Sequence, residues 1–319
     1  MPKVFLTRSS AELIDKVRDG LEWVDWKTIV QPHARVFVKP NFTWNKRIPG
    51  ATTTPALLES LLAILTSRTS NVIVGESDGG MHAFTAEESF AVHNMPDICR
   101  QYGAKLVNLS RLERESVTTT VGGKPHTFNL PRLLLHETDV FITVPLLKVH
   151  MWTGVSLGFK NQWGCIPDTM RLLEHYRLHE GIVALNKILR PRVSIIDGLT
   201  ALDGNGPIFG TPVTFNTLII SNDLGAGDLI GCKVMGIDPM RIRHLALAQS
   251  EGILPRISDV ELNEPVERFA THRFRPVRTG LNRVSILIAK SARALRFVYA
   301  SRATPYLYRV VNQFRRRNL

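Results

Sequence analysis

The chain has 319 residues, of which 44% are hydrophobic and 21% charged; this composition indicates a globular protein and excludes a disordered chain, a collagen or a disulfide-stabilised miniprotein. Its three cysteines are widely spaced and form no CxxC motif, which argues against an iron–sulfur cluster or a four-cysteine zinc site. The net charge is +12, but 13 of the 40 basic residues and none of the 28 acidic ones follow Glu267, so the preceding part is nearly neutral.

Short apolar segments alternate with helical ones along the first 267 residues. Runs rich in β-branched residues predict strands at 35–39, 71–75, 105–109, 139–144, 192–197 and 214–221. Apolar spacing predicts helices at 55–67, 87–102 and 181–188, and Gly122-Gly123 predicts a hairpin between 116–121 and 126–130. Nearly all-apolar strands separated by helices are typical of a mostly parallel sheet with helices on both faces. We therefore predict an α/β body over residues 1–267.

Residues 268–319 form a basic tail with helical periodicity. Large apolar residues recur every three or four positions from Leu281 to Tyr299, and Pro305 separates them from a second short helical stretch that ends near Phe314. Such a basic amphipathic helix is suited to an anionic membrane surface. The alternative is a helix packed on the body or on a second subunit of a homo-oligomer. Nucleic acid is disfavoured, because the body shows no basic stripe and no nucleic-acid-binding module.

The sequence favours a cytoplasmic protein. It has no apolar run of the roughly 18 residues needed to cross a bilayer, and its first residues lack the apolar stretch and cleavage site of a signal peptide. With the basic tail, this predicts a cytoplasmic location, peripheral at the inner face of the membrane if the tail binds lipid.

Polar, charged or glycine-rich loops follow five of the predicted strands. Ligands of open α/β sheets bind at the carboxyl ends of the strands, so these loops predict a site for a small anionic ligand or a nucleotide-like cofactor. Thr54, which precedes Pro55 at a helix start, can cap the helix or hold an anion. The residues that we expect to bind the ligand or cofactor are Lys39, Asn41, Thr54, Ser77, Asp78 and Asn161.

The segment 148–165 (KVHMWTGVSLGFKNQWGC) concentrates reactive side chains among small residues. Glycines allow a ligand to approach the backbone closely. Histidine can act as a general base near neutral pH, and a desolvated lysine can become a nucleophile. We therefore expect His150, Lys160 and Lys148 to be catalytic. Cys165 is either a reactive thiol or, more commonly for such a position, a buried inert one.

Two pairs of residues are candidates for a divalent metal ion. His175 and His179 lie four positions apart and would share one face of a helix, as a metal-binding pair can. Asp197 and Asp223 lie near the ends of predicted strands and could bind a hard cation such as magnesium. The alternatives are a surface helix that happens to carry two histidines, and aspartates that cap helices or turns.

Four blocks of sequence resemble the DUF362 family of bacterial and archaeal proteins, over roughly residues 33–255. They are VKPN with the following TTTP, PLLKVHMWTGVSLGFKNQWGCIPD, IIDGLTALDGNGPIFGTP and SNDLGAGDLIGCKVMGIDP. The family name records that its function is not established. Many members carry a ferredoxin-like cysteine cluster that this chain lacks, so the resemblance implies no electron-transfer role.

A fainter, local resemblance connects the same segment with lactate racemase-type enzymes. His150 and Lys160, ten positions apart across a turn rich in Gly and Ser, look like the segment in which a histidine is the acid/base and a lysine carries a nickel-pincer nucleotide. His175 lies near the distance of a nickel-ligating histidine, although Ser-Leu-Gly-Phe departs from the residues that precede the lysine there. The resemblance implies a shared ancestral site rather than a shared cofactor.

Two functional hypotheses follow. The first is an enzyme that acts on a small carboxylate- or phosphate-bearing substrate by proton or hydride transfer, like a racemase or a cofactor-dependent oxidoreductase, with a metal or nucleotide-like cofactor. The second is a non-catalytic ligand-binding protein that its basic tail places on a membrane surface or on a partner. We favour the enzyme.

Overall fold

The protein is built around one large, mostly parallel sheet of ten strands. The computed structural model describes residues 1–9, 12–302 and 304. The main path of the sheet runs in the order β12 (Glu261–Leu262), β1 (Lys3–Arg8), β11 (Thr211–Ser221), β10 (Val193–Asp203), β7 (Val140–Thr143), β2 (Val36–Lys39), β3 (Val72–Glu76) and β4 (Lys105–Asn108). Two further strands, β8 (Leu146–His150) and β9 (Gly154–Ser156), extend it beside the long strand β10. The predicted α/β class is confirmed.

Strand β11 is antiparallel to both of its neighbours in this mostly parallel sheet. β11 pairs antiparallel with both β1 and β10. The carboxyl end of β11 therefore points to the opposite edge of the sheet from the ends of β2, β3 and β7, which are parallel to one another. Asn222 and Asp223, which follow β11, are thereby separated from the other strand-end loops.

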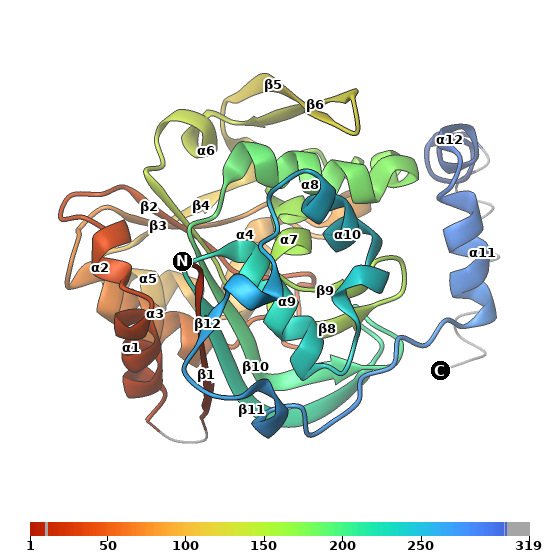
Figure 1. Ribbon diagram of the computed structural model, residues 1–319. Helices are drawn as coiled ribbons and strands as arrows, with labels where there is room; N and C mark the ends of the chain where they lie inside the picture. Colours follow the sequence, from red (N-terminus) through yellow and green to blue (C-terminus); the bar gives the residue numbers. More distant parts are fainter. Residues whose placement is uncertain (10–11, 303, 305–319) are drawn as a thin grey trace.

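Helices cover both faces of the sheet (Figure 1). In β2, Val36 and Val38 belong to one buried cluster and Phe37 to the other, because successive side chains of a strand point to opposite faces. One cluster is completed by α1 (Leu13–Trp23), α3 (Pro55–Thr66) and α5 (Met95–Gln101), and the other by α8 (Leu178–Leu189), α9 (Leu224–Val234) and α10 (Arg243–Ser250). The shorter helices are α2 (Trp26–Ile29), α4 (Ala86–Val92), α6 (Arg132–His136) and α7 (Gly158–Asn161).

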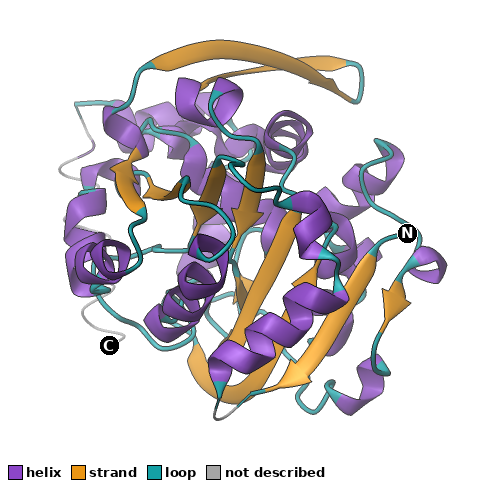
Figure 2. Ribbon diagram, turned by 90° about the vertical axis from the view of Figure 1, so that its left-hand side faces the viewer, coloured by secondary structure: helices purple, strands orange, loops and turns teal. Residues whose placement is uncertain are grey.

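Short 3-10 helices link these elements. They are η1 (Gly80–His82), η2 (Leu109–Arg111), η3 (Gln162–Cys165), η4 (Arg171–Arg177), η5 (Pro239–Arg241), η6 (Ile257–Asp259) and η7 (Val266–Arg268). The predicted hairpin is present as β5 (Arg114–Val121) and β6 (Lys124–Pro131), and it arches over one end of the molecule (Figure 2). Gly122 and Gly123 both have positive φ, as the primed turn of a two-residue hairpin requires.

Two predicted helices are each divided in the structure. The segment 87–102 forms α4 and α5, because Asn94 adopts a left-handed conformation between them. The tail segment 281–299 forms α11 (Gly280–Ile288) and α12 (Ala292–Ala300), since the Ser291 hydroxyl accepts a hydrogen bond from the amide of Ala294 and starts a new helix. The second tail helix predicted after Pro305 lies outside the described residues.

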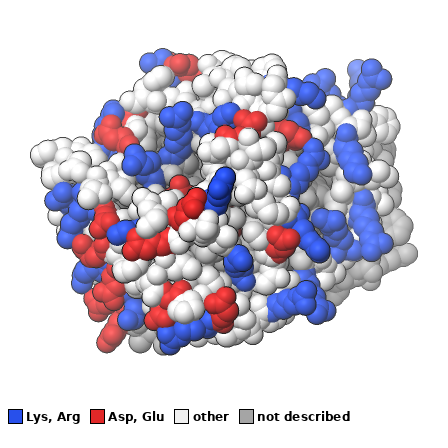
Figure 3. All heavy atoms as spheres, in the orientation of Figure 1, with Lys and Arg blue, Asp and Glu red and all other residues white. Residues whose placement is uncertain are grey.

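The described part of the tail packs on the body. Phe274 is buried, and its amide donates to the carbonyl of Met235. His272 contacts the Asp203 carboxylate at 2.8 Å. Helices α11 and α12 then stand at one side of the molecule (Figure 1), the side on which Lys and Arg side chains gather in Figure 3.

Candidate functional site

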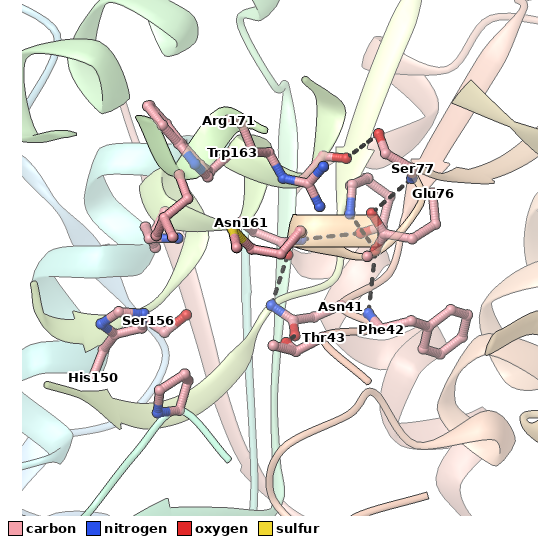
Figure 4. Close-up of a pocket in the computed structure, with 18 of the residues that line it drawn as sticks. Asn41, Phe42, Thr43, Glu76, Ser77, His150, Ser156, Asn161, Trp163 and Arg171 are labelled. Atoms are coloured by element: carbon pink, nitrogen blue, oxygen red, sulfur yellow. Dashed lines mark hydrogen bonds and ion pairs between the residues drawn. The ribbon is translucent and has the colours of Figure 1, made fainter. Parts of the chain in front are cut away.

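A cavity of about 250 Å³ opens where the loops after β2 and β3 meet the segment β8–α7–η4. Because β2 and β3 are parallel neighbours, Lys39 and Glu76 leave the sheet at the same edge. Figure 4 shows His150 and Ser156 on one side of the cavity and Glu76 and Ser77 on the other. The five charged residues that line it are Lys39, Glu76, Lys148, Lys160 and Arg171.

Lys39 and Glu76 form a buried ion pair. The ammonium of Lys39 lies 2.5 Å from the Glu76 carboxylate and also donates to the carbonyl of Pro40, and both side chains are almost fully buried. Glu76 also accepts the backbone amides of Phe42 and Ser77. Lys39 is therefore neutralised within the protein, and Glu76 holds the two loops together.

Lys148 is fully buried and fully hydrogen-bonded. Its ammonium donates to Asn41 Oδ1 at 3.0 Å, to Thr43 Oγ1 at 3.0 Å and to the carbonyl of Ala51 at 2.7 Å. Burial, and then the neighbouring Lys160, lower its pKa to about 7. Three acceptors occupy all three N–H donors, so Lys148 holds the loop 41–51 in place and has no donor left for a ligand.

Lys160 differs from Lys148 in having no such acceptors. Among the described residues its ammonium has no hydrogen-bond acceptor and no carboxylate partner, and it lies 6.0 Å from the ring centre of Trp163. Burial, followed by the charges of Arg171 and Lys39, lowers its pKa to about 7. The amine is therefore free to contact a ligand and can gain or lose a proton near neutral pH.

The short helix α7 positions Lys160. The backbone amides of Gly158 and Phe159 donate to the two carboxylate oxygens of Asp228 at 2.7 and 2.9 Å, which anchors the first turn. A side chain at position 158 would come within 2.5 Å of Leu224 and 2.7 Å of the Asp228 carboxylate, so the close approach requires glycine. Burial raises the pKa of Asp228 to about 7.

Arg171 is the fourth cation at the cavity. Its guanidinium donates to the backbone carbonyls of Asp78 (2.7 Å), Asp168 (3.1 Å) and Ile166 (3.3 Å), and no carboxylate within the described residues forms an ion pair with it. Within the part of the chain that the structure describes, four lysine or arginine side chains line the cavity and Glu76 is its one acidic residue. Lys39 and Lys148 are buried, and Lys160 and Arg171 are partly buried. Poorly solvated charges without partners are costly, so this excess of positive charge leaves the cavity electrostatically incomplete until an anion enters.

The two histidines of the cavity are neutral. Burial lowers the pKa of His175 to about 3 and that of His150 far below its ordinary value, with the nearby lysine charge of Lys160 adding to both effects. The Nδ1 atom of His150 accepts the amide of Trp152 at 3.1 Å, which leaves the proton on Nε2. His150 can therefore donate a hydrogen bond to a ligand while remaining uncharged.

Several predicted binding residues serve to join the loops. Asn41 donates to Asn161, whose own amide donates to Thr143 at 2.9 Å. The Ser77 hydroxyl donates to the carbonyl of Gly164 at 2.6 Å. All three predicted residues line the cavity, but their hydrogen bonds connect the elements that carry the cations.

Other predicted residues lie outside the cavity lining. The Thr54 amide donates to the Asp197 carboxylate, so the helix start at Thr54 is occupied by a buried aspartate rather than by a ligand. Asp78 accepts the Ala86 amide, and Asp223 caps α9 through the Ala226 amide. These contacts match the alternative interpretation of the aspartates as caps.

The four predicted metal ligands do not come together. His175 lines the cavity, whereas His179 stacks on His244 with ring centres 5.9 Å apart. Asp197 lies within β10 and Asp223 follows the antiparallel strand β11. Among the described residues, no three histidine, cysteine or carboxylate side chains form a group that could hold a metal ion.

The sequence interpretation missed two of the five charged residues that line the cavity, and it left the role of Cys165, which lies next to the lining residue Gly164, open. Glu76 was not singled out, although it directly follows the predicted strand 71–75. Arg171 gave no signal, because it stands in a segment whose pattern is typical of an exposed helix. Cys165 is buried, and burial raises the pKa of its thiol to about 12, which supports the inert alternative.

A family model described as a domain of unknown function (DUF362) matches residues 36–233. The match spans more than half of the chain, so the protein belongs to this family. It includes the strands β2, β3 and β7 and every charged residue named at the cavity. None of the matched proteins supports the local resemblance to lactate racemase-type enzymes.

A curated relative is the thylakoid-associated protein sll1697 of Synechocystis sp., which is 29% identical over 246 residues. The alignment covers 72% of the length of each of the two proteins. A crystal structure of a Thermotoga maritima protein, determined by a structural genomics consortium, aligns with a TM-score of 0.43 and 14% identity. That alignment covers 76% of this chain and 60% of the other chain. Among the described residues, no helix is long and apolar enough to span a membrane.

Proposed function

We propose that this DUF362 protein is an enzyme that binds a small carboxylate- or phosphate-bearing substrate in the cationic cavity and moves a proton on it. The observation that carries the proposal is the surplus of positive charge at the cavity. The buried Lys148 and the partly buried Lys160 and Arg171 have no carboxylate partner among the described residues, and only Lys39 is neutralised, by Glu76. An anion at this position would replace the missing counter-charges.

The cations would divide the work between binding and proton transfer. Arg171 is held by three backbone carbonyls and stays protonated, so it suits the fixed recognition of an anionic group. Lys160 has a pKa of about 7, where a general base or acid is most effective. His150 donates a neutral hydrogen bond from Nε2, which suits a carbonyl or enolate oxygen.

The reaction class that fits these roles is proton transfer at a carbon next to a carboxylate. The neutral amine of Lys160 takes the proton from the substrate carbon, and the electron pair left on that carbon delocalises into the carboxylate. The surrounding positive charge stabilises this dianion, and Lys160 then returns the proton.

Hydrogen exchange at the substrate carbon tests this function. The full chain is incubated in deuterium oxide with small 2-hydroxy, 2-oxo and phosphorylated carboxylates that raise its melting temperature, and proton NMR follows the loss of the α-hydrogen signal. We expect exchange with at least one of them, and its loss in Lys160→Met. If an acid binds in the cavity of the native protein but its α-hydrogen does not exchange, the protein binds the ligand without catalysing proton transfer, and the proposed enzymatic function is wrong.

For its location we propose a peripheral position at the cytoplasmic face of a membrane. The relative's name describes a thylakoid-associated protein, and the described residues hold no membrane-spanning helix. Fractionation of cells should then recover the chain with the membranes at low salt and release it at high salt. Recovery in the soluble fraction at every salt concentration would contradict the location.

A further inference from the structure

Helix α11 turns three of its large apolar side chains toward solvent, while Ile286 and Ile288 are partly buried. Leu281, Val284 and Leu287 lie three positions apart on one face and are 36%, 54% and 66% exposed. The opposite face is attached to the body through polar groups: Asn282 donates to Asn205 at 2.6 Å, and the indole of Trp152 donates to Ser285 at 3.3 Å. A helix that merely packs on a globular body shows the reverse arrangement.

Helix α12, the next element of the chain, also exposes an apolar side chain. Leu295 is buried and fixes the helix on the body beside η4, whereas Phe297 is 60% exposed. We call the exposed apolar side chains of the two helices, Leu281, Val284, Leu287 and Phe297, the C-terminal surface.

Unpaired basic residues surround the C-terminal surface. Arg283, Lys290, Arg293, Arg296 and Arg302 are all exposed, and none forms an ion pair with a carboxylate among the described residues. No acidic residue follows Glu267 in the sequence. Figure 3 shows the resulting concentration of Lys and Arg on the side where α11 and α12 lie.

We propose that the C-terminal surface binds an anionic lipid bilayer, with the apolar side chains entering the acyl boundary and the arginines contacting the headgroups. An interfacial helix needs both components, because apolar burial and attraction to anionic lipid add together. A nucleic acid would satisfy the arginines but would leave Val284, Leu287 and Phe297 in water. The inference does not depend on the chemistry of the cavity.

Vesicle co-sedimentation of the full chain tests the inference. The probe is phosphatidylcholine vesicles with and without about 30% phosphatidylglycerol, in about 0.1 M salt. We expect binding to the anionic vesicles alone and an at least tenfold weaker partition for Lys290→Glu/Arg293→Glu/Arg296→Glu. The matched control is Lys105→Glu/Arg114→Glu/Lys124→Glu, which reverses three exposed cations of the body and should bind like the native protein. None of the three forms an ion pair with a described residue, and Arg114 donates one hydrogen bond, to the carbonyl of Ser110.

A second variant separates a bilayer from other polyanions. Val284→Ser/Leu287→Ser keeps every charge and should also weaken vesicle binding at least tenfold, while its melting temperature stays unchanged because both side chains are exposed. Equal binding by this variant and the native chain, or equal loss in the body control, would overturn the proposal. Retained exchange activity in both tail variants would show that the cavity functions independently of this surface.

Discussion

The cavity and the C-terminal surface both carry an excess of positive charge, but the basic side chains of the C-terminal surface are exposed to water and those of the cavity are not. At the cavity, burial lowers the pKa of Lys148 and Lys160 to about 7. On α11 and α12 the arginines remain solvated. We therefore propose that the same residue types act in proton transfer at the cavity and in membrane binding at the C-terminal surface, and that the difference in burial accounts for the difference in role.

Removing the Glu76 carboxylate from the cavity should have the largest effect. Glu76→Gln leaves the buried Lys39 without its partner, so we expect a loss of about 3–5 kcal/mol in the free energy of unfolding. Urea denaturation measures it. Glu174→Gln, which breaks the half-exposed pair with Arg177, serves as the control and should cost less than about 1 kcal/mol. Similar losses in both variants would show that the cavity is not electrostatically incomplete.

Removing a cation should act in the opposite direction. Lys160→Met deletes a partly buried charge that has no partner among the described residues, so we expect an unchanged or higher melting temperature together with at least tenfold weaker anion binding. Lys187→Met, which affects a lysine paired with Glu251 outside the cavity, is the control for binding. A clear loss of stability in Lys160→Met would assign this residue a structural role.

Stability should rise with pH above neutrality. In the folded protein Lys148 and Lys160 lose their protons near pH 7, but in the unfolded chain they keep them up to about the ordinary value of 10.5. Between these values the unfolded state binds more protons, so these two groups make the free energy of unfolding increase with pH. Denaturation between pH 7 and about 9 should show this slope for the native chain, and a smaller slope for Lys160→Met. An equal slope in the two proteins would contradict the lowered pKa of Lys160.

The smallest effect should follow from neutralising the solvated cations. Arg293→Gln and Arg296→Gln change exposed side chains that form no ion pair among the described residues. We therefore expect each to alter the free energy of unfolding by less than about 0.5 kcal/mol. A larger change, measured by thermal denaturation, would mean that these arginines support the fold rather than face a partner.

The fold class could be predicted from the sequence, and so could the position of three residues of the cavity lining. Lys39 ends β2, and Lys148 and His150 lie in β8 directly after β7, so strand-end reasoning brings them to the same edge of the sheet. The same reasoning misplaces Asp223, because the antiparallel direction of β11 depends on tertiary pairing, which local pattern does not encode. Arg171 was missed because nothing in its neighbourhood predicts the hydrogen bond to the Asp78 carbonyl that holds it at the cavity.

Isothermal titration of inorganic phosphate and of a small dicarboxylate into the native protein and Lys160→Met, at neutral and alkaline pH, tests whether the cavity is an anion-binding site. We expect that the native cavity binds at least one of these anions, that its affinity falls up to roughly tenfold per pH unit above 7 as Lys160 deprotonates, and that Lys160→Met binds at least tenfold more weakly. Absence of binding at neutral pH, or affinity that is the same in both proteins and at both pH values, would show that the cavity is not such a site.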